Sequence, residues 1–516
     1  MDQNLESNDL ENLIIKDKNY YRKRRIKILS ITIPIILVTA IVIALIILLM
    51  PEPDNKIICL YNIEKANESI ILININNDIN YSLTINGTNH GKKNSHNFGK
   101  AGIYEVIFDF KNKLESLEGL FEENIYLIDA DLSKLQIDNI TSMASLFKSC
   151  KKLKRVYFDN KTPNLKNINN MFSDCLKLNT TYLNFDTSKV VKMDNMFYKC
   201  INLTSLDISN FNLESVVNTS SMFHACLNLQ EIKFNNNTLT NNLEDMNHIF
   251  SSCNSLKTIN TNIFRQNNLT NLNYVFKDCW KLTSIDLSNF ESKYITELIG
   301  TFYECRNLKN INFNNFDTSN VISIDNIFQN CINLIEVNMS MINAENLTNV
   351  SYAFSGCKSL VNVFLPDKMI SLISTEYMFE GCSNLASINL EFLREPYYLC
   401  SFEGMFKGCS NLIEVNFPNS TIIDSFASMA EMFSECINLK AVNMEGLTIF
   451  EILQMEYMFY GCKNLERLNI KNINTEYLAT LNYIFEGVVK KVKVEYNPNI
   501  TCRRLENEIQ KIILKE

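Results

Sequence analysis

The sequence predicts an α/β solenoid, in which tandem repeats stack with a parallel sheet on one face and short helices on the other. A small β-rich N-terminal cap and one N-terminal transmembrane helix complete the predicted fold. Three observations predict it. A Phe-x-x-Cys pair recurs thirteen times at spacings of 25 to 27 residues, each copy alternates between two hydrophobic periods, and a segment of 23 residues near the N-terminus carries no charge. A fixed repeat length of this size is typical of solenoids.

Each copy contains a helical and a strand-like apolar pattern. Up to the cysteine, apolar residues lie at i, i+3, i+4 and i+7, which predicts one face of a short helix. After the cysteine the spacing becomes L-x-x-L-x-L, whose last steps suit a strand with one buried face. In residues 184–211 the first set is Met193, Met196, Phe197 and Cys200, and the second is Leu203, Leu206 and Ile208.

Stacking must supply the stability, because one copy cannot bury its own apolar face. The cysteines are expected to line up as buried, reduced side chains, one per coil, with no metal bound. We call this set the cysteine ladder. Its members are Cys150, Cys175, Cys200, Cys226, Cys253, Cys279, Cys305, Cys331, Cys357, Cys382, Cys409, Cys436 and Cys462.

Several copies carry the same polar turn. It reads "LDISNF" at 206–211, "IDLSNF" at 285–290 and "FDTSNV" at 316–321. These segments resemble the 26-residue bacterial surface protein repeat of BspA-like leucine-rich-repeat surface proteins, and the resemblance covers about residues 117–487. It implies a leucine-rich-repeat stack and a general role in surface adhesion and interaction.

The N-terminal region predicts a membrane anchor. Residues 1–27 are polar, predicted disordered, and basic at their end, and residues 28–50 are uncharged and long enough to cross a bilayer as a helix. The basic side orients the N-terminus toward the cytoplasm. An uncleaved signal anchor is favoured over a cleavable signal peptide, whose apolar region is shorter. The predicted localisation is therefore the plasma membrane, single-pass, with the C-terminal part extracellular.

The remaining boundaries follow from where the repeat starts and stops. Residues 51–116 lack it and are expected to form a small β-rich capping module. Residues 117–487 hold about fifteen copies, and residues 488–516 are expected to cap the end with a strand and a helix. Sequons after the predicted anchor are candidate glycosylation sites if the source organism glycosylates; they include Asn67, Asn86, Asn202, Asn218, Asn268, Asn346 and Asn419.

Composition and motifs argue against catalysis and nucleic-acid binding. The net charge is −8, only four histidines occur, and we find no phosphate loop, nucleophile elbow or metalloprotease motif. We therefore expect no enzyme activity, no cofactor, no metal and no nucleic-acid partner. Because the ladder would be buried, its thiols are not expected to act as nucleophiles.

Recognition is expected on the outward positions of the strands. Amides prevail there, and they either bond from coil to coil or face a ligand; three aromatic residues are candidate anchors. The predicted function is adhesion or recognition of an extracellular protein or glycan at the cell surface, and the alternative is a surface coat or spacer without a dedicated ligand. The candidate ligand-facing residues are Tyr157, Tyr182, Asp207, Asp286, Asn312, Asn338, Phe364, Asn389, Asn416 and Asn443.

Overall fold

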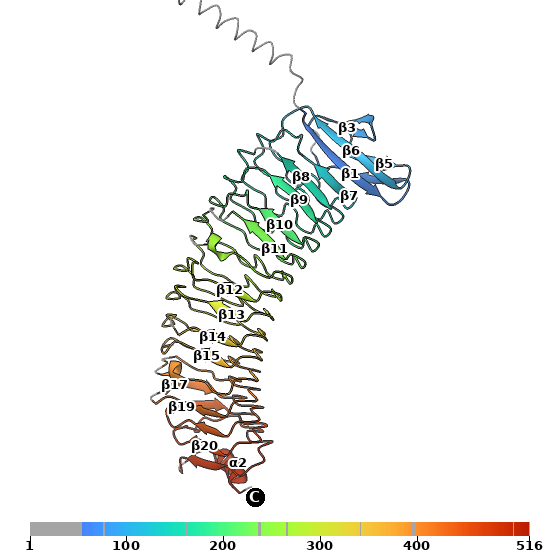
Figure 1. Ribbon diagram of the computed structural model, residues 1–516. Helices are drawn as coiled ribbons and strands as arrows, with labels where there is room; N and C mark the ends of the chain where they lie inside the picture. The colour runs from blue at the N-terminus through green and yellow to red at the C-terminus, as the bar shows by residue number, and fades with distance from the viewer. Residues whose placement is uncertain are drawn as a thin grey trace, which may run out of the picture. The chain divides into compact units, whose positions relative to one another are not determined.

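The computed structural model divides the chain into two units, Met1–Asp54 and Asn55–Glu516. It describes residues 54–514 except 76–77, 160–161, 236–238, 265–266, 341, 395, 397, 420 and 499. The predicted tail at 1–27 and the predicted anchor at 28–50 lie outside the described residues. The second unit is a β-solenoid (Figure 1).

The second unit begins with six strands. Four of them, β1, β3, β4 and β6, belong to the sheet that runs on into the solenoid, and β2 and β5 form a separate antiparallel pair. Strand β1 pairs antiparallel with β6 on one side and with β7, the first solenoid strand, on the other. The edge of the first coil is thus paired rather than open, which removes a site for unwanted strand addition. The bounds are β1 (Lys56–Ile63), β2 (Glu68–Ile71), β3 (Tyr81–Ile85), β4 (Thr88–Gly91), β5 (Ser95–Phe98) and β6 (Gly102–Phe110).

The solenoid strands come from the L-x-x-L-x-L segments. Neighbouring strands pair in parallel and in register, as in Leu206 opposite Ile232 and Val337 opposite Val363. The strands are β7 (Leu127–Asp131), β8 (Arg155–Asp159), β9 (Thr180–Asn184), β10 (Ser205–Ile208), β11 (Glu231–Phe234), β12 (Ser284–Asp286), β13 (Asn310–Asn312), β14 (Glu336–Asn338), β15 (Asn362–Phe364), β16 (Glu414–Asn416), β18 (Ala441–Asn443), β20 (Arg467–Ile470) and β21 (Lys493–Tyr496).

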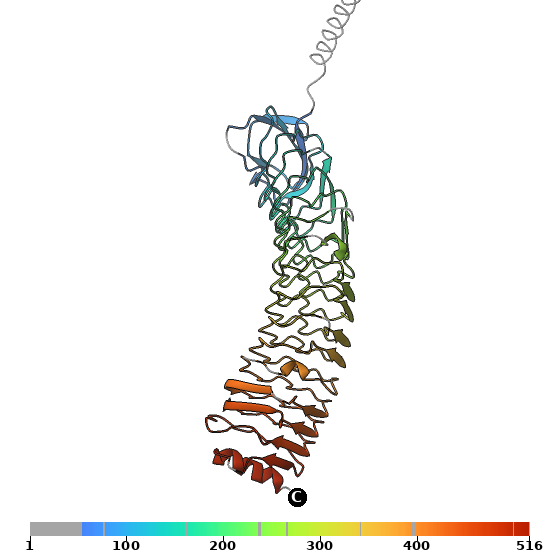
Figure 2. The same ribbon diagram turned by 90° about the vertical axis from the view of Figure 1, so that its left-hand side faces the viewer.

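The other regular elements are few. Strands β17 (Thr421–Ser428) and β19 (Leu447–Gln454) form a separate parallel pair, seen as two orange arrows in Figure 2. Two short 3₁₀ turns are η1 (Thr261–Phe264) and η2 (Glu391–Leu393). Within the described residues the one α-helix is α2 (Arg503–Ile513), which follows the last coil.

The predicted helices opposite the sheet are wrong, and the α/β fold class is corrected to a β-solenoid. The segments that carry the i, i+3, i+4, i+7 pattern form consecutive tight turns, which we call the turn ribbon of each coil. In residues 193–200, alternate N–H groups donate to the carbonyl three residues earlier: Met196 to Met193 (3.3 Å), Tyr198 to Asn195 (3.1 Å) and Cys200 to Phe197 (3.0 Å).

The intervening N–H groups of the ribbon leave the coil altogether. Asn195 donates to Ser220 (2.9 Å), Phe197 to Met222 (2.8 Å) and Lys199 to His224 (2.8 Å), all in the next coil. Asn195 and Lys199 have φ values of 55° and 57°, and a positive φ every fourth residue is incompatible with an α-helix. The apolar residues are nevertheless buried as predicted, because the ribbon also returns every fourth residue to the same face.

The predicted membrane localisation is also corrected. In the part of the chain that the structure describes, no helix is both long enough and apolar enough to cross a bilayer. Within the described residues, neither the single-pass plasma-membrane assignment nor the transmembrane element of the predicted fold is supported.

Two rows of buried side chains run along the solenoid core. Phenylalanine rings stack from Phe121 to Phe485, one per coil, with centroids 5.4 to 5.7 Å apart. Beside them, all thirteen thiols of the cysteine ladder are buried and unbridged. Each thiol donates to the carbonyl of the preceding coil's stacked phenylalanine at 3.0 to 3.2 Å. The cysteine thus links neighbouring coils as well as filling space.

Candidate functional site

The strand face carries the residues predicted to meet a ligand. Eight of the ten candidates are exposed, and Asn312 and Asn443 are half-buried. Tyr157 and Tyr182 lie side by side, because β8 and β9 place them opposite each other in parallel register. Their side chains are 38% and 52% exposed, and Phe364 on β15 is 47% exposed. The structure does not bring Phe364 together with the tyrosines, since several coils separate β9 from β15.

Most of the polar candidates form hydrogen bonds within their own coil. Six of them accept the backbone N–H two residues later at 2.9 to 3.1 Å, which ends the strand in a tight turn. These are Asp207, Asp286, Asn312, Asn338, Asn389 and Asn443. Asn416 differs because Pro418, two residues later, has no N–H; its amide donates to Glu414 (2.9 Å) instead.

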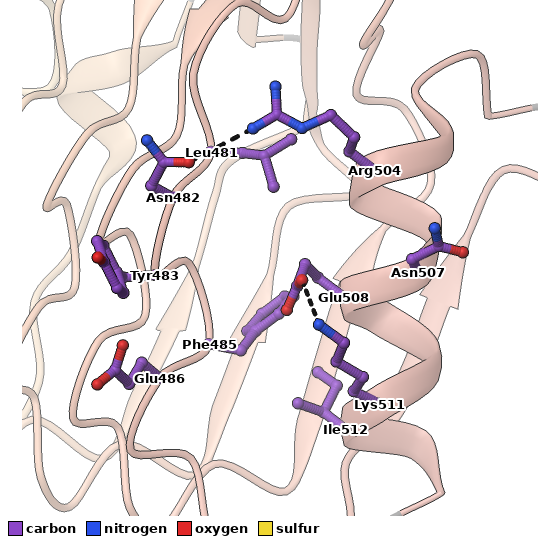
Figure 3. Close-up of a pocket in the computed structure, with 10 residues that line it drawn as sticks. All are labelled: Leu481, Asn482, Tyr483, Phe485, Glu486, Arg504, Asn507, Glu508, Lys511 and Ile512. Carbon is purple, nitrogen blue, oxygen red and sulfur yellow. Dashed lines mark hydrogen bonds and ion pairs between the residues drawn. The ribbon is translucent and has the colours of Figure 1, made fainter.

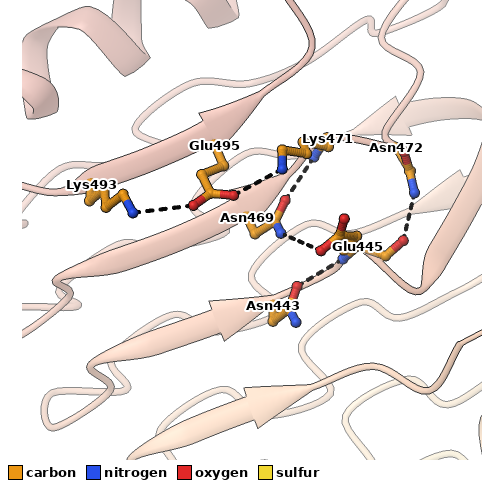
Figure 4. A network of polar contacts seen from close by, with 7 residues as sticks. All are labelled: Asn443, Glu445, Asn469, Lys471, Asn472, Lys493 and Glu495. Carbon is orange, nitrogen blue, oxygen red and sulfur yellow. Dashed lines mark hydrogen bonds and ion pairs between the residues drawn. The ribbon is translucent and has the colours of Figure 1, made fainter.

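Bonds between coils on this face are less regular than the predicted amide row. Asn312 donates to Asp286 of the preceding coil (3.0 Å), and Asn469 donates to Glu445 (3.1 Å). Figure 4 shows how Glu495 continues this network, accepting from Lys471 (3.1 Å) and Lys493 (3.4 Å). The polar strip is therefore partly satisfied by the protein itself, which weakens its claim to be the binding surface.

The two aspartates of the strip stay ionised. Hydrogen bonds from Ser209 hold the pKa of Asp207 below its ordinary value, and the backbone of Ser288 does the same for Asp286. Both carboxylates are on the exposed strand face, and Lys233 lies opposite Asp207 on the next strand.

An exposed apolar row at the start of the strand face, one position before each strand, was missed by sequence reasoning. It consists of Ile335, Val361 and Ile413, which are 52%, 43% and 47% exposed, with the smaller Ala386 between the last two. Val361 donates its N–H to the Ile335 carbonyl (2.9 Å), and Ile413 donates to Ala386 (3.2 Å), so the row follows consecutive coils. The sequence did contain a signal, because this slot follows the first buried leucine and holds threonine, lysine or another polar residue in the other copies, as at Thr204, Thr283 and Gln230.

Acidic groups border the apolar row. Glu336 accepts from Asn362 (3.1 Å), and Glu414 accepts from Asn416 (2.9 Å) and lies 3.9 Å from Arg467. Phe364 ends β15, three residues after Val361, and is 47% exposed. Lys309 and Lys440 hold the same slot in the coils on either side of the row and are exposed, so the border carries both acidic and basic groups. The arrangement can hold apolar side chains of a partner.

The ladder thiols cannot serve as nucleophiles or ready metal ligands. Burial raises the pKa of every one of them, to about 12 for Cys226, so the reactive thiolate is disfavoured. The other three cysteines, Cys59, Cys400 and Cys502, are also unbridged. Among the described residues no three His, Cys, Asp or Glu side chains gather as a metal site would require. Two histidines of the N-terminal module, His90 and His96, do lie together, and their rings meet edge to face with centroids 4.8 Å apart.

The candidate glycosylation sites differ in exposure. Asn67, Asn86, Asn268, Asn346 and Asn419 are exposed, whereas Asn202 and Asn218 are half-buried. Asn346 donates its side-chain amide to the Ser319 carbonyl of the preceding coil (2.7 Å), so a glycan there would replace a bond between coils.

A run of aromatic side chains crosses four turn ribbons. Its members are Tyr198, His224, His248 and Tyr274, whose successive ring centroids are 5.1, 5.9 and 4.9 Å apart. Lys199 and Lys277 lie over the terminal tyrosines at 5.0 and 5.5 Å. Burial, with smaller contributions from His248 and the lysines, lowers the pKa of His224 to about 4.

This histidine should make stability depend on pH. Because the folded pKa lies below the ordinary 6.5, the unfolded chain binds more protons between pH 6.5 and 4, and stability falls as pH drops through that window. Solvent screening reduces the effect, because His224 is partly exposed. We expect the free energy of unfolding of the wild type to fall by about 1 kcal/mol more than that of His224→Gln between pH 6.5 and 5. Denaturant titrations at the two pH values measure the difference, and equal losses in both proteins would contradict this role.

Comparisons with known proteins place the chain in a family. A family model described as "Mycoplasma protein of unknown function, DUF285" matches residues 115–237, 159–264, 270–391 and 399–500. No curated protein matches the chain. The BspA-like assignment made from sequence stays a prediction.

Three solved bacterial structures are similar to the chain. A leucine-rich repeat protein from Bacteroides ovatus is 18% identical, with 69% of this chain and 87% of that chain covered and a TM-score of 0.42. One from Eubacterium ventriosum is 14% identical (72% and 92% covered, TM-score 0.34). A leucine rich cell surface protein from Faecalibacterium prausnitzii is 15% identical (78% and 86% covered, TM-score 0.34). These TM-scores are too low to indicate a shared function. The family matches, in contrast, span more than half of the sequence, and the chain therefore belongs to the Mycoplasma family DUF285.

Proposed function

We propose that this protein is a recognition protein that binds another polypeptide across the strand face of its solenoid, with the apolar row as the anchor. The observation that carries the proposal is the exposure of Ile335, Val361 and Ile413 in a slot that is polar in most other coils. Contiguous exposed apolar side chains with a polar border are typical of protein interaction surfaces.

The border suggests what the partner offers. Glu336 and Glu414 flank the row, so the partner would insert apolar side chains and place lysine or arginine beside them. Solenoids use extended surfaces of this kind for extended partners. Adhesion and glycan binding are finer forms of the proposal; the adjacent Tyr157 and Tyr182 support the second, because exposed aromatic rings stack on sugars and on protein side chains.

The proposal assigns no catalytic chemistry to the chain. The raised pKa of the buried ladder thiols supports this, since none is present as a thiolate at neutral pH. A second candidate function is a coat or spacer without a dedicated ligand. The observation that favours it is the local use of six strand-face side chains, which end their strands instead of facing solvent freely.

The test replaces the row by the residue that other coils carry in the same slot. The triple variant Ile335→Thr, Val361→Thr, Ile413→Thr should fold, because Thr204 and Thr283 occupy this slot natively. Peptides selected from a displayed library against the full chain should be rich in apolar and basic residues. Their affinity should fall at least about tenfold in the variant, as expected when several anchoring side chains are lost.

The matched control makes the same chemical change on another side of the coil. Ile322 and Ile373 are each 43% exposed beside the ribbon, in a slot that holds Thr296 and Thr348 in other coils. Ile322→Thr, Ile373→Thr should leave peptide affinity within about twofold. Equal losses in the two variants, or a library that yields no binder, would refute recognition through the row and favour the spacer.

A further inference from the structure

The hydrogen bonds between successive turn ribbons all run in the same direction along the stack. The outward N–H groups of each ribbon all point to the next coil, and the carbonyls between them all accept from the previous coil. In the last complete pair of ribbons, the donors and acceptors are Met455 to Thr480 (2.8 Å), Tyr457 to Asn482 (2.9 Å), Phe459 to Ile484 (2.9 Å) and Gly461 to Glu486 (2.7 Å). A stack of such ribbons therefore ends in carbonyls at one end and in N–H groups at the other.

The last ribbon, residues 481–487, has no coil beyond it. The N–H groups of Leu481, Tyr483, Phe485 and Gly487 correspond to the donors of earlier coils, but none has an acceptor among the described residues. The carbonyls between them are already used by the preceding coil. We call these four N–H groups the donor edge, because they present hydrogen-bond donors and no free acceptors.

The opposite end of the ribbon stack is partly covered. Asn74 of the N-terminal module donates its backbone N–H to the Leu120 carbonyl (2.8 Å) and its side-chain amide to the carbonyls of Gly119 (3.2 Å) and Glu122 (3.0 Å). Two of the first ribbon's four outward carbonyls, those of Leu120 and Glu122, are thus occupied by Asn74, which stands in the way of a second copy of the protein docking its first coil on the donor edge.

A cleft of about 960 Å³ separates the donor edge from helix α2. Figure 3 shows the ribbon on one side and the helix on the other. Phe485 and Ile512 give the cleft apolar walls, and Arg504 reaches across it toward Asn482, with 3.4 Å between its guanidinium nitrogen and the amide oxygen. Lys511 is paired with Glu508 (2.6 Å), and Glu486 also lines the cleft on the ribbon side, so Arg504 is the cation that contacts the ribbon.

We infer that this cleft binds an acidic polypeptide segment, whose carboxylates accept hydrogen bonds from the donor edge and pair with Arg504. An ordinary β-strand does not fit, because each of its edges presents carbonyls and N–H groups alternately, and its N–H groups would face those of the ribbon. Groups that only accept hydrogen bonds fit all four donors, as anions do at other arrays of backbone N–H groups. The length of the edge and the volume of the cleft suit several carboxylates on one chain. This site is separate from the strand face and does not depend on the function proposed there.

The test measures binding of a fluorescein-labelled octaglutamate peptide to the full chain by fluorescence anisotropy. Arg504→Glu should weaken binding at least about tenfold, because it removes the cation and places a competing carboxylate beside the donor edge. Arg503→Glu is the matched control: it makes the same charge change on the neighbouring exposed residue, which does not line the cleft. It should change affinity by no more than about twofold, and both variants should melt like the wild type.

Hydrogen exchange gives a second readout that does not depend on the variants. Amides of residues 481–487 should exchange faster than those of 455–461 in the free protein and should slow when octaglutamate is added. Octaglutamine at the same concentration should not slow them. No binding of octaglutamate, equal weakening by the two charge variants, or protection that spares residues 481–487 would each overturn the inference.

Discussion

Replacing Phe302 by alanine is expected to lower the free energy of unfolding by about 3 to 5 kcal/mol. Phe302 is 1% exposed, and its ring stacks on Phe276 at 5.6 Å and on Phe328 at 5.5 Å. Removing the ring leaves a cavity and takes away both contacts between coils. A solenoid has no contacts between distant coils to compensate, because each coil touches only its neighbours.

Chemical denaturation of the full chain measures this loss, and Phe364→Ala provides the control. Phe364 is the same residue type in the same part of the solenoid, but its side chain is 47% exposed and outside the stack. Its replacement should change stability by no more than about 0.5 kcal/mol. If the two variants lost similar amounts, the stack would not be the main bond between coils.

The strand half of each coil could be predicted from the sequence. Leu206 and Ile208 alternate with Ser205 and Asp207, and β10 buries the first two and exposes the others. Alternation fixes which residues face inward once a strand forms, so the outward candidates on the other strands were also placed on the exposed face. The register between neighbouring strands is also fixed, because the buried leucines of neighbouring copies repeat at the same positions.

The ribbon half could not be predicted from its apolar pattern. Met193, Phe197 and Cys200 would share a face in a helix and also do so in the ribbon, so burial does not separate the two structures. The sign of φ at the outward slots separates them. Gly404 (φ 58°) and Gly408 (φ 71°) occupy both positive-φ slots of one ribbon, and a glycine directly precedes four ladder cysteines. Glycine in the middle of a short helix is unfavourable, and its recurrence was the signal for turns.

The two proposed sites differ in how far a sequence could reveal them. The apolar row is visible as a change of residue type at one slot, Ile335 where another copy has Thr204, but it required the slot to be known as exposed. The donor edge has no side-chain signature, because backbone N–H groups form it. It follows from the polarity of the ribbon and from where the stack ends, and both are properties of the folded chain.

Deleting residues 306–331 should leave a folded protein. This removes one whole coil of 26 residues and joins Cys305 to Ile332, which restores the Cys-Ile-Asn-Leu order found after Cys200. Phe302 can then stack on Phe354, and β12 can pair with β14, because the coils on both sides of the deletion share the same register. The ribbons keep their donors and acceptors matched. We expect cooperative thermal unfolding with the melting temperature lowered by no more than about 5 °C.

Deleting only residues 306–318 should abolish folding around the junction. This half-coil deletion removes β13 and leaves two turn ribbons in succession, so that the first ribbon is no longer followed by a strand. The unpaired N–H groups and exposed phenylalanines would open the solenoid there. Limited proteolysis should cut this variant near the junction and leave the whole-coil variant intact. Deletion of residues 280–305, which joins Cys279 to Arg306, repeats the whole-coil change one coil earlier and should behave like the first. A stack held together by matched ribbons should tolerate the loss of a whole coil but not of part of one. Equal resistance of the half-coil and whole-coil variants to proteolysis would therefore mean that the coil is not the unit of stability.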